Sequence, residues 1–365
     1  MHEIAIRNAL ICDGSGEPAY YGEIGIVGEK ISALGPLIGE ARQEIDAKGL
    51  VISPGIIDSH THYDAQITWD ATASPSLSLG VTTLIMGNCG FTIAPCRPQD
   101  REQTLRNLTQ VEGMSLDALL SGTRSDYQTF DEYLEMIESL GMVPNVAVYC
   151  GHSSIRTWVM GADATKRTAT AAEVDEMKSL IAAAIKSGAI GFSTSTFEAH
   201  NGWGGVPMPS RFADDSELRA LVGTLGEVGA GRFMLTKGRN TSIEFLESLA
   251  ADTGRPVIVA AIQHNHATPT RAADDMAAIG AAVARGHKMI GQVACTAISM
   301  EFTLTSAYLF ESMQAWQPAI ALYTDKAALA QFYRDPAFRS AMKAELTAAN
   351  ALNRFTDQWD KLEIL

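Results

Sequence analysis

The sequence lacks any apolar run long enough to span a bilayer, and its first residues lack the charged-then-apolar form of a signal peptide. Basic residues are scarce, with 28 lysines and arginines against 42 acidic residues, and they form no stripe that would bind nucleic acid. Only five cysteines are present, odd in number and scattered, which argues against a disulfide framework. We therefore expect a cytoplasmic protein with reduced thiols that binds neither nucleic acid nor a membrane.

What the sequence does contain is enough apolar material for a large core. Of the 365 residues, 46% are hydrophobic and 19% are charged. This length accommodates one α/β barrel or two smaller domains. The net charge of −14 indicates an acidic, well-solvated surface.

The first 54 residues predict a small all-β domain. Short strand patterns alternate here with turn residues, at 3–11, 22–27, 31–34 and 43–45. Because such short strands bury little apolar surface by themselves, we expect this piece to pack against another part of the protein.

From Gly55 onward, buried-strand patterns alternate with helical ones, which is typical of βαβ units in a parallel sheet. Seven such strands are predicted, at 55–58, 81–86, 145–150, 189–193, 232–236, 257–263 and 288–293. Helix starts are predicted at Thr170, Asp214 and Thr241, the first and last as capping boxes. The pattern predicts an α/β fold, a (β/α)8 TIM-type barrel without its last strand.

The domain organisation expected from these patterns has three parts. Residues 1–54 form the N-terminal part of the β-domain, 55–298 a metal-dependent barrel, and 299–365 a helical insertion after strand seven. The best candidate for an eighth strand is 319–325, which ends in the carboxylate of Asp325, although helical patterns lie on both sides of it.

Two histidines and a cysteine follow the first two barrel strands, where barrel enzymes place their chemistry. His60 and His62 are separated by one residue, so on a strand end they face the same way. Cys89 follows the second strand. Imidazole and thiol groups at neighbouring strand ends predict a metal half-site. The alternative is that the histidines cap a turn and the cysteine is an inert core residue.

Polar residues follow most of the other strands as well. His152 and Arg156 follow strand three, Lys237 and Arg239 follow strand five, and His264 follows strand six. Each has a structural alternative: His152 can hydrogen-bond the next loop, and Lys237 can be an ordinary loop cation. The gathering of polar residues at one end of the strands therefore supports a functional site there more strongly than any single residue does.

The long segment after strand four predicts a flexible flap over the mouth of the barrel. It runs from 197 to 211 and contains several glycines. Its glycines lack the Lys-Ser/Thr ending of a phosphate-binding loop. Trp203 and Arg211 would then be available to a substrate.

Several segments resemble the D-aminoacylase, or N-acyl-D-amino-acid deacylase, branch of the amidohydrolase superfamily: Pro54–Asp64, Gly80–Thr83, Gly87–Pro95, Gly151–Arg156 and Gly188–Thr194. The resemblance covers most of the chain, and Gly87–Gly90 is its most specific part. It implies a barrel with a small β-domain. It also implies one or two zinc ions held by His60, His62, Cys89 and His264.

Two positions depart from that family. The family has a metal-binding histidine where this chain has Lys237 after Thr236. An ammonium cannot ligate zinc, so Lys237 either is carbamylated or simply replaces the ligand. The family also has a general-base aspartate at the end of strand eight, and no equivalent is evident here. We therefore expect a fragment or a truncated relative.

The resemblance implies removal of the acyl group from an N-acyl-D-amino acid, a small-molecule substrate with a linear amide. His152 and Asp64 are the candidate catalytic residues. The substrate carboxylate would meet one of four cations, Arg156, Arg211, Lys237 and Arg239. The extra charge of Lys237 and Arg239 would suit an acidic substrate such as an N-acyl-D-glutamate.

Two alternatives to this function remain. A cyclic amide or imide hydrolase of the dihydropyrimidinase type would need a carbamylated lysine after strand four, where this chain has Ser193–Ser195. A non-catalytic barrel is the other alternative, because the strand-eight aspartate is not found and Lys237 replaces a histidine. Zinc binding without turnover would distinguish that barrel from an enzyme.

Overall fold

The structure is a computed structural model that describes residues 1–112, 114–265, 268–297, 299–305, 307–311, 313–347 and 359–364. These residues form two compact units. The first comprises Met1–Ile57 with Leu79–Thr83, and the second comprises Asp58–Ser78 with Leu84–Leu365. The predicted domain limits of 1–54, 55–298 and 299–365 stay predictions.

The N-terminal unit contains a separate sheet, as the sequence predicted, but with five strands where four were predicted, because the short β5 was not foreseen. Its central strand β1 pairs antiparallel with β2 and parallel with β4 and β5, and β2 pairs antiparallel with β3. The strands are β1 (His2–Ile11), β2 (Tyr20–Val27), β3 (Lys30–Gly35), β4 (Ala41–Asp46) and β5 (Val51–Ile52). Its core is small and consists of Ala9, Ile11, Ile24 and Ala47.

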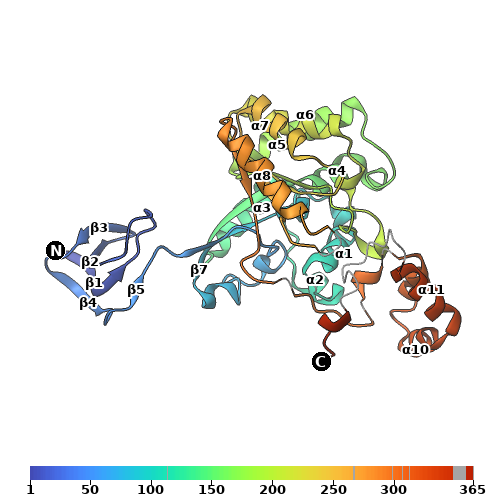
Figure 1. The fold of residues 1–365 in the computed structure, drawn as a ribbon, viewed down its shortest axis with the longest axis horizontal. Helices are drawn as coiled ribbons and strands as arrows, with labels where there is room; N and C mark the ends of the chain where they lie inside the picture. The colour runs from blue at the N-terminus through green and yellow to red at the C-terminus, as the bar shows by residue number, and fades with distance from the viewer. Residues whose placement is uncertain are drawn as a thin grey trace. The chain divides into compact units, whose positions relative to one another are not determined.

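A second sheet has seven strands whose spatial order follows the chain, from β6 to β12. Figure 1 labels β7 of this sheet and the helices α1 to α8. The neighbours from β8 to β12 pair in parallel. Its strands are β6 (Ile56–Asp58), β7 (Val81–Met86), β8 (Asn145–Gly151), β9 (Gly191–Ser195), β10 (Arg232–Thr236), β11 (Val257–Ala260) and β12 (Met289–Gly291). The predicted barrel-type α/β fold is confirmed as a curled parallel sheet, and its strand ends set up the site described below.

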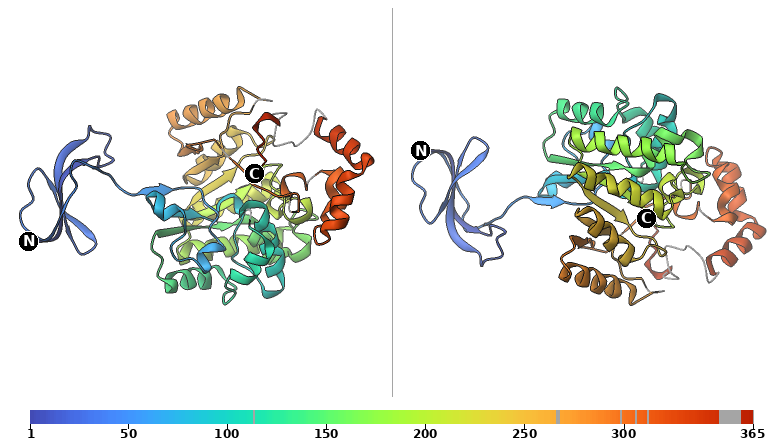
Figure 2. Two further views of the ribbon diagram at one scale, coloured as in Figure 1. Left: turned by 90° about the horizontal axis from the view of Figure 1, so that it is seen from below. Right: turned by 90° about the horizontal axis from the view of Figure 1, so that it is seen from above.

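Helices cover the outside of this sheet, and those from α5 to α8 pack against one another in sequence order (Figure 2). The helices are α1 (Arg101–Glu112), α2 (Leu116–Gly122), α3 (Phe130–Leu140), α4 (His152–Met160), α5 (Ala171–Ser187), α6 (Asp215–Val228), α7 (Ile243–Thr253), α8 (Arg271–Ala284), α9 (Gln317–Ile320), α10 (Lys326–Arg334) and α11 (Pro336–Thr347). Among the described helices, none combines the length and apolar character needed to cross a membrane.

The helix starts at Thr170 and Asp214 are confirmed, because each side chain accepts a hydrogen bond from the backbone N–H three residues later. The start predicted at Thr241 is wrong by one residue. Ser242 caps α7 by accepting from the Phe245 N–H, and the Thr241 hydroxyl instead meets Thr196 Oγ1 at 2.7 Å. Two adjacent hydroxyl residues precede this helix, and the pattern could not decide between them.

The candidate eighth strand at 319–325 is also wrong. Its first residues belong to helix α9 and the following residues form turns. The Asp325 carboxylate accepts from the Ala327 and Ala328 N–H groups and so caps α10. Ala319 packs into a separate cluster with Trp316, which favours the helical form over an extended one.

Candidate metal centre

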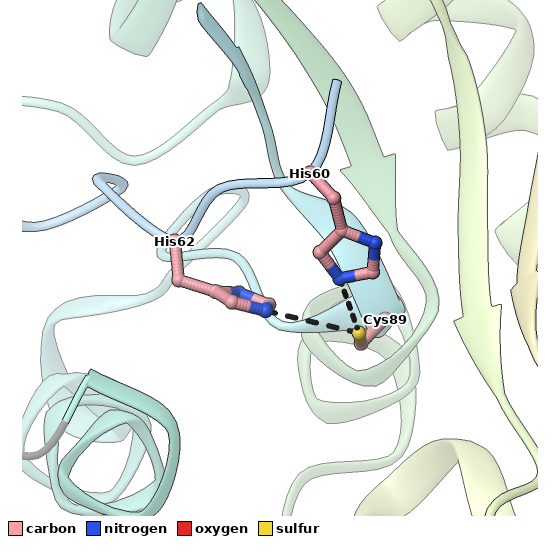
Figure 3. Close-up of side chains that lie close together, drawn as sticks. All are labelled: His60, His62 and Cys89. Atoms are coloured by element: carbon pink, nitrogen blue, oxygen red, sulfur yellow. Dashed lines mark hydrogen bonds between the residues drawn. The ribbon is translucent and has the colours of Figure 1, made fainter. Parts of the chain in front are cut away.

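Three side chains predicted as metal ligands meet in the structure (Figure 3). A nitrogen of His60, a nitrogen of His62 and the sulfur of Cys89 all lie within 4.8 Å of one another. The Cys89 sulfur is 3.2 Å from His60 Nε2 and 3.8 Å from His62 Nε2. In a tetrahedral zinc site, bond lengths place a nitrogen and a sulfur ligand about 3.5 Å apart. The observed separations bracket that value.

The backbone after β7 holds Cys89 in an unusual conformation. Cys89 has φ 59°, in the left-handed region that is strained for a residue with a Cβ. Gly87 also has positive φ, and a Cβ there would lie 2.5 Å from the Tyr149 carbonyl oxygen. Ser193 holds the turn by accepting from the Gly90 N–H and donating to the Gly87 carbonyl. The tight turn therefore directs the sulfur toward the histidines.

Two further side chains contact this group, and the sequence did not single them out. The Thr236 hydroxyl, at the end of β10, donates to the Cys89 sulfur at 3.0 Å. Gln292 Oε1, just after β12, lies 2.8 Å from His60 Nδ1. Both residues lie at strand ends, and this position could have marked them as candidates in the sequence. Their contacts with Cys89 and His60, however, join segments far apart in the chain.

Burial sets the protonation of the three groups. It lowers the pKa of His62 to about 3 and, with a smaller shift, also lowers the pKa of His60. Both imidazoles are therefore neutral, which is the form that binds metals. Burial also raises the pKa of the Cys89 thiol to about 12, so this sulfur needs a cation to become a thiolate. His62 Nδ1 is buried and has no hydrogen-bond partner among the described residues.

Asp64, a predicted catalytic residue, is completely buried and contacts the turn that carries Cys89. Its Oδ2 accepts from the Gly87 N–H at 3.1 Å, and its Oδ1 finds no partner within the described parts of the chain. Burial raises the pKa of this carboxyl to about 7, although the Gly87 hydrogen bond opposes the shift. This raised pKa lies close to neutral pH.

His152 and Arg156 form a buried network with Glu217 of α6. His152 Nδ1 lies 2.8 Å from Thr194 Oγ1, and Nε2 lies 2.9 Å from Glu217 Oε1. Arg156 donates to both oxygens of the same carboxylate and to the Arg167 carbonyl. Both ring nitrogens of His152 are therefore hydrogen-bonded, to residues of β9 and α6 and not to the next loop.

The other predicted substrate-binding cations differ in exposure. Lys237 Nζ lies 3.2 Å from Asp275 Oδ2 of α8, and its side chain is only 9% exposed. This is an ion-pair distance, and Lys237 directly follows Thr236, the residue of β10 that donates to Cys89. Arg239 is 60% exposed, whereas Arg211 is half-buried and donates to Asn201 Oδ1 at 2.5 Å.

His264 lies outside the three-residue group, and its side chain is exposed. The prediction placed it at the end of a strand spanning 257–263, but β11 ends at Ala260. The backbone after Ala260 therefore leaves the sheet before it reaches His264. Its role as a ligand stays a prediction.

Comparison with known proteins gives a consistent picture. The chain is 34% identical over 196 residues to a D-aminoacylase of Alcaligenes xylosoxydans xylosoxydans, a match covering 53% of this chain and 38% of that protein. It is 35% identical over 196 residues to an N-acyl-D-aspartate deacylase of the same organism, a match covering 53% of this chain and 37% of the relative. The chain thus spans less than half the length of these curated relatives.

A solved structure shows the same fold. It is a D-aminoacylase studied for its binuclear metal centre, with 27% identity, a TM-score of 0.62, and coverage of 79% of this chain and 57% of that one. Residues 43–359 match the amidohydrolase family over most of the sequence. This chain therefore belongs to the amidohydrolase family.

Proposed function

We propose that this protein is a zinc-dependent amidohydrolase that removes the acyl group from N-acyl-D-amino acids. The observation that carries the proposal is the convergence of His60, His62 and Cys89 at two neighbouring strand ends. Such a donor set has little use in a purely structural core, because it leaves His62 Nδ1 buried and unpaired among the described residues. The deacylase relatives support the substrate class.

Zinc is the ion that these donors suit best. Imidazole and thiolate are its usual ligands, and three protein ligands leave a coordination position open for chemistry. The related D-aminoacylase with a binuclear centre supports one or two ions. A bound divalent metal would supply Lewis acidity that polarises an amide carbonyl and acidifies water.

The two predicted catalytic residues receive different roles. Asp64 would take and return a proton at Oδ1, the carboxylate oxygen that has no partner in the described structure. Its raised pKa suits that exchange. Both ring nitrogens of His152 are hydrogen-bonded within a buried network, so we assign it a structural role there and not a chemical step.

Exposure favours Arg239 for binding the substrate carboxylate. Its side chain is 60% exposed, against 9% for Lys237 and 0% for Arg156. Lys237 and Arg156 are held by the less exposed carboxylates of Asp275 and Glu217, whereas Arg239 Nε makes a long contact of 3.8 Å with Glu198 Oε1. Recognition of an acidic substrate would therefore rest on Arg239, with Arg211 of the flap as a second donor.

The test is zinc content per chain, together with hydrolysis of a panel of N-acetyl-D- and N-acetyl-L-amino acids, for the wild type and Cys89→Ala. We expect bound zinc and D-selective release of free amine in the wild type, and loss of both in Cys89→Ala. Hydrolysis that survives Cys89→Ala would contradict the proposed site. Zinc without turnover would favour the non-catalytic barrel, and faster hydrolysis of cyclic ureides would favour the dihydropyrimidinase alternative.

A further inference from the structure

Gln292 directly follows β12 and lies 232 positions from His60 in the chain. Its side-chain amide nevertheless contacts His60 and the preceding residue, Ser59. Its Oε1 is 2.8 Å from His60 Nδ1. Its Nε2 is 3.1 Å from the Ser59 carbonyl oxygen and 2.9 Å from Ser59 Oγ. One amide thus spans two consecutive residues of the loop after β6.

The Ser59 carbonyl fixes which way this amide faces. A carbonyl oxygen only accepts hydrogen bonds, so the group next to it must be the NH2 of Gln292. The oxygen of the amide therefore faces His60, and because that oxygen also only accepts, His60 Nδ1 must carry the hydrogen. His60 Nε2 is then the nitrogen with the lone pair, and it lies 3.2 Å from the Cys89 sulfur.

We propose that Gln292 is a positioning residue for metal binding, because it holds His60 in the tautomer and ring orientation that present Nε2 to the ion. The inference rests on the proposed metal function. Metal-ligating histidines depend on a partner for their second nitrogen, and losing that partner typically costs 10- to 100-fold in affinity. The second histidine cannot make up for a loss of order at His60, since no partner of this kind orients His62 through Nδ1 in the described part of the chain.

Three variants separate positioning from a merely structural role. Gln292→Leu removes both the acceptor for His60 and the donor to Ser59. Gln292→Glu keeps an acceptor for His60 Nδ1 but loses the donor to Ser59. Gln66→Leu is the matched control, because Gln66 also donates through its amide to a loop carbonyl, that of Ser74, and to the side chain of Asp70.

The first measurement is zinc affinity by competition with a chromophoric chelator, with thermal unfolding to confirm that each variant folds. We expect Gln292→Leu to bind zinc roughly 10- to 100-fold more weakly, as for loss of an outer partner. Gln292→Glu should stay within about threefold of the wild type, and Gln66→Leu should be unchanged. The second measurement is the tautomer of His60 in metal-free protein, from long-range 15N–1H NMR spectra, where Gln292→Leu should lose the pure Nδ1–H form.

Several results would overturn the proposal. Gln292→Glu as weak as Gln292→Leu would show that the bridge to Ser59 matters and the acceptor does not. An Nε2–H tautomer of His60 in the wild type, or full zinc affinity in Gln292→Leu, would also contradict it. Absence of deacylase turnover with this affinity pattern intact would refute the proposed reaction alone, whereas a wild type that binds no zinc would refute both.

Discussion

The sulfur of Cys89 is the residue-scale feature on which the metal centre depends most. It is buried, its backbone is held in a left-handed turn, and a single hydroxyl donates to it from Thr236. Because burial raises the pKa of this thiol, the sulfur keeps its proton at neutral pH in the absence of a metal. A bound metal cation would displace that proton and stabilise the thiolate. If the proposed function holds, ligation would give the positive φ of Cys89 a role, because the turn directs the sulfur toward the histidines.

Replacement of this sulfur should abolish tight zinc binding without unfolding the protein. We expect Cys89→Ser to lower zinc affinity by at least about 100-fold, more than the loss of an outer partner. Equilibrium dialysis with zinc analysis would measure the loss. Cys96→Ser is the matched control, since Cys96 is also buried and contacts Thr104 Oγ1 at 3.5 Å, outside the three-residue group. Equal losses in both variants would contradict a ligand role for Cys89.

The buried network of His152, Arg156 and Glu217 should make the protein less stable in acid. Burial lowers the pKa of His152 below its usual 6.5. Burial alone would raise the pKa of Glu217, but the contacts with His152 and Arg156 outweigh it and lower that pKa below 4.5. Below pH 6.5 the unfolded chain therefore binds a proton that folded His152 does not. The free energy of unfolding must fall as the pH falls, by up to ~1.4 kcal/mol per pH unit for one histidine.

Urea unfolding between pH 5.5 and 8 would measure this dependence for the wild type and His152→Gln. We expect the wild type to lose stability more steeply below pH 6.5, and the two curves to run parallel above pH 7.5. His60 and His62 also have lowered pKa values, so His152→Gln should reduce the slope and not remove it. Identical slopes would mean that folding does not lower the pKa of His152, and would contradict this prediction.

At the level of single residues, the sequence predicted those contacts that depend only on residue type and on position at the end of a strand. His60, His62 and Cys89 meet because a His-x-His pair and a cysteine follow adjacent strands. The contact of Gln292 with His60 could not be predicted, because it depends on how far the sheet curls and brings distant loops together. The ion pair of Lys237 with Asp275 could not be predicted for the same reason, since Asp275 lies on helix α8, three elements after β10.

At the scale of elements, β9 shows how closely the sheet is packed. All five of its residues are buried, and Phe192 stacks on Phe233 of β10 with ring centroids 5.9 Å apart. Because the strand is covered on both faces, none of its positions can accept a larger side chain without displacing a neighbour. The glycine that begins it is the extreme case, because a Cβ on Gly191 would lie 1.9 Å from the Arg232 carbonyl oxygen.

Two glycine substitutions should therefore have opposite effects. Gly191→Ala should force β9 and β10 apart and lower the free energy of unfolding by about 3 kcal/mol or more, as expected for severe overpacking. Gly223→Ala, in α6 where nothing lies within 4 Å of the added atom, should raise stability by about 0.5–1 kcal/mol. Chemical denaturation of both variants is the measurement, and a neutral Gly191→Ala would contradict the close pairing of these strands.

The order of elements was largely predictable from the alternation of strand and helix patterns, and all seven strands of the parallel sheet appear where such patterns occur. The failures came where local patterns are ambiguous. The apolar run at 319–325 fits a strand or a helix equally well, and packing beside Trp316 decided for the helix. Strand β11 ends at Ala260, before the end of the apolar run at 257–263. Hydrophobicity alone therefore did not determine where the strand ends.

At the scale of the whole molecule, each of the two units has a core of its own. The ligand side chains and both of their supporting partners, Thr236 and Gln292, belong to the second unit. These residues come from the ends of four strands, β6, β7, β10 and β12, that are far apart in the chain. A metal bound to the ligands would join the segments after β6 and β7, so metal binding and global stability should be linked.

Zinc should therefore stabilise the protein, and its removal should leave a folded but less stable chain. A ligand that binds only the folded state at 100 times its dissociation constant contributes about 2.7 kcal/mol. For a protein of this size, that corresponds to a rise of several degrees in Tm. Calorimetry of the wild type with zinc, and after treatment with a chelator, would measure the difference. Cys89→Ser should show the lower Tm in both conditions, while Cys96→Ser should respond to zinc like the wild type. A zinc-dependent rise that persists in Cys89→Ser would place the binding site elsewhere in the molecule.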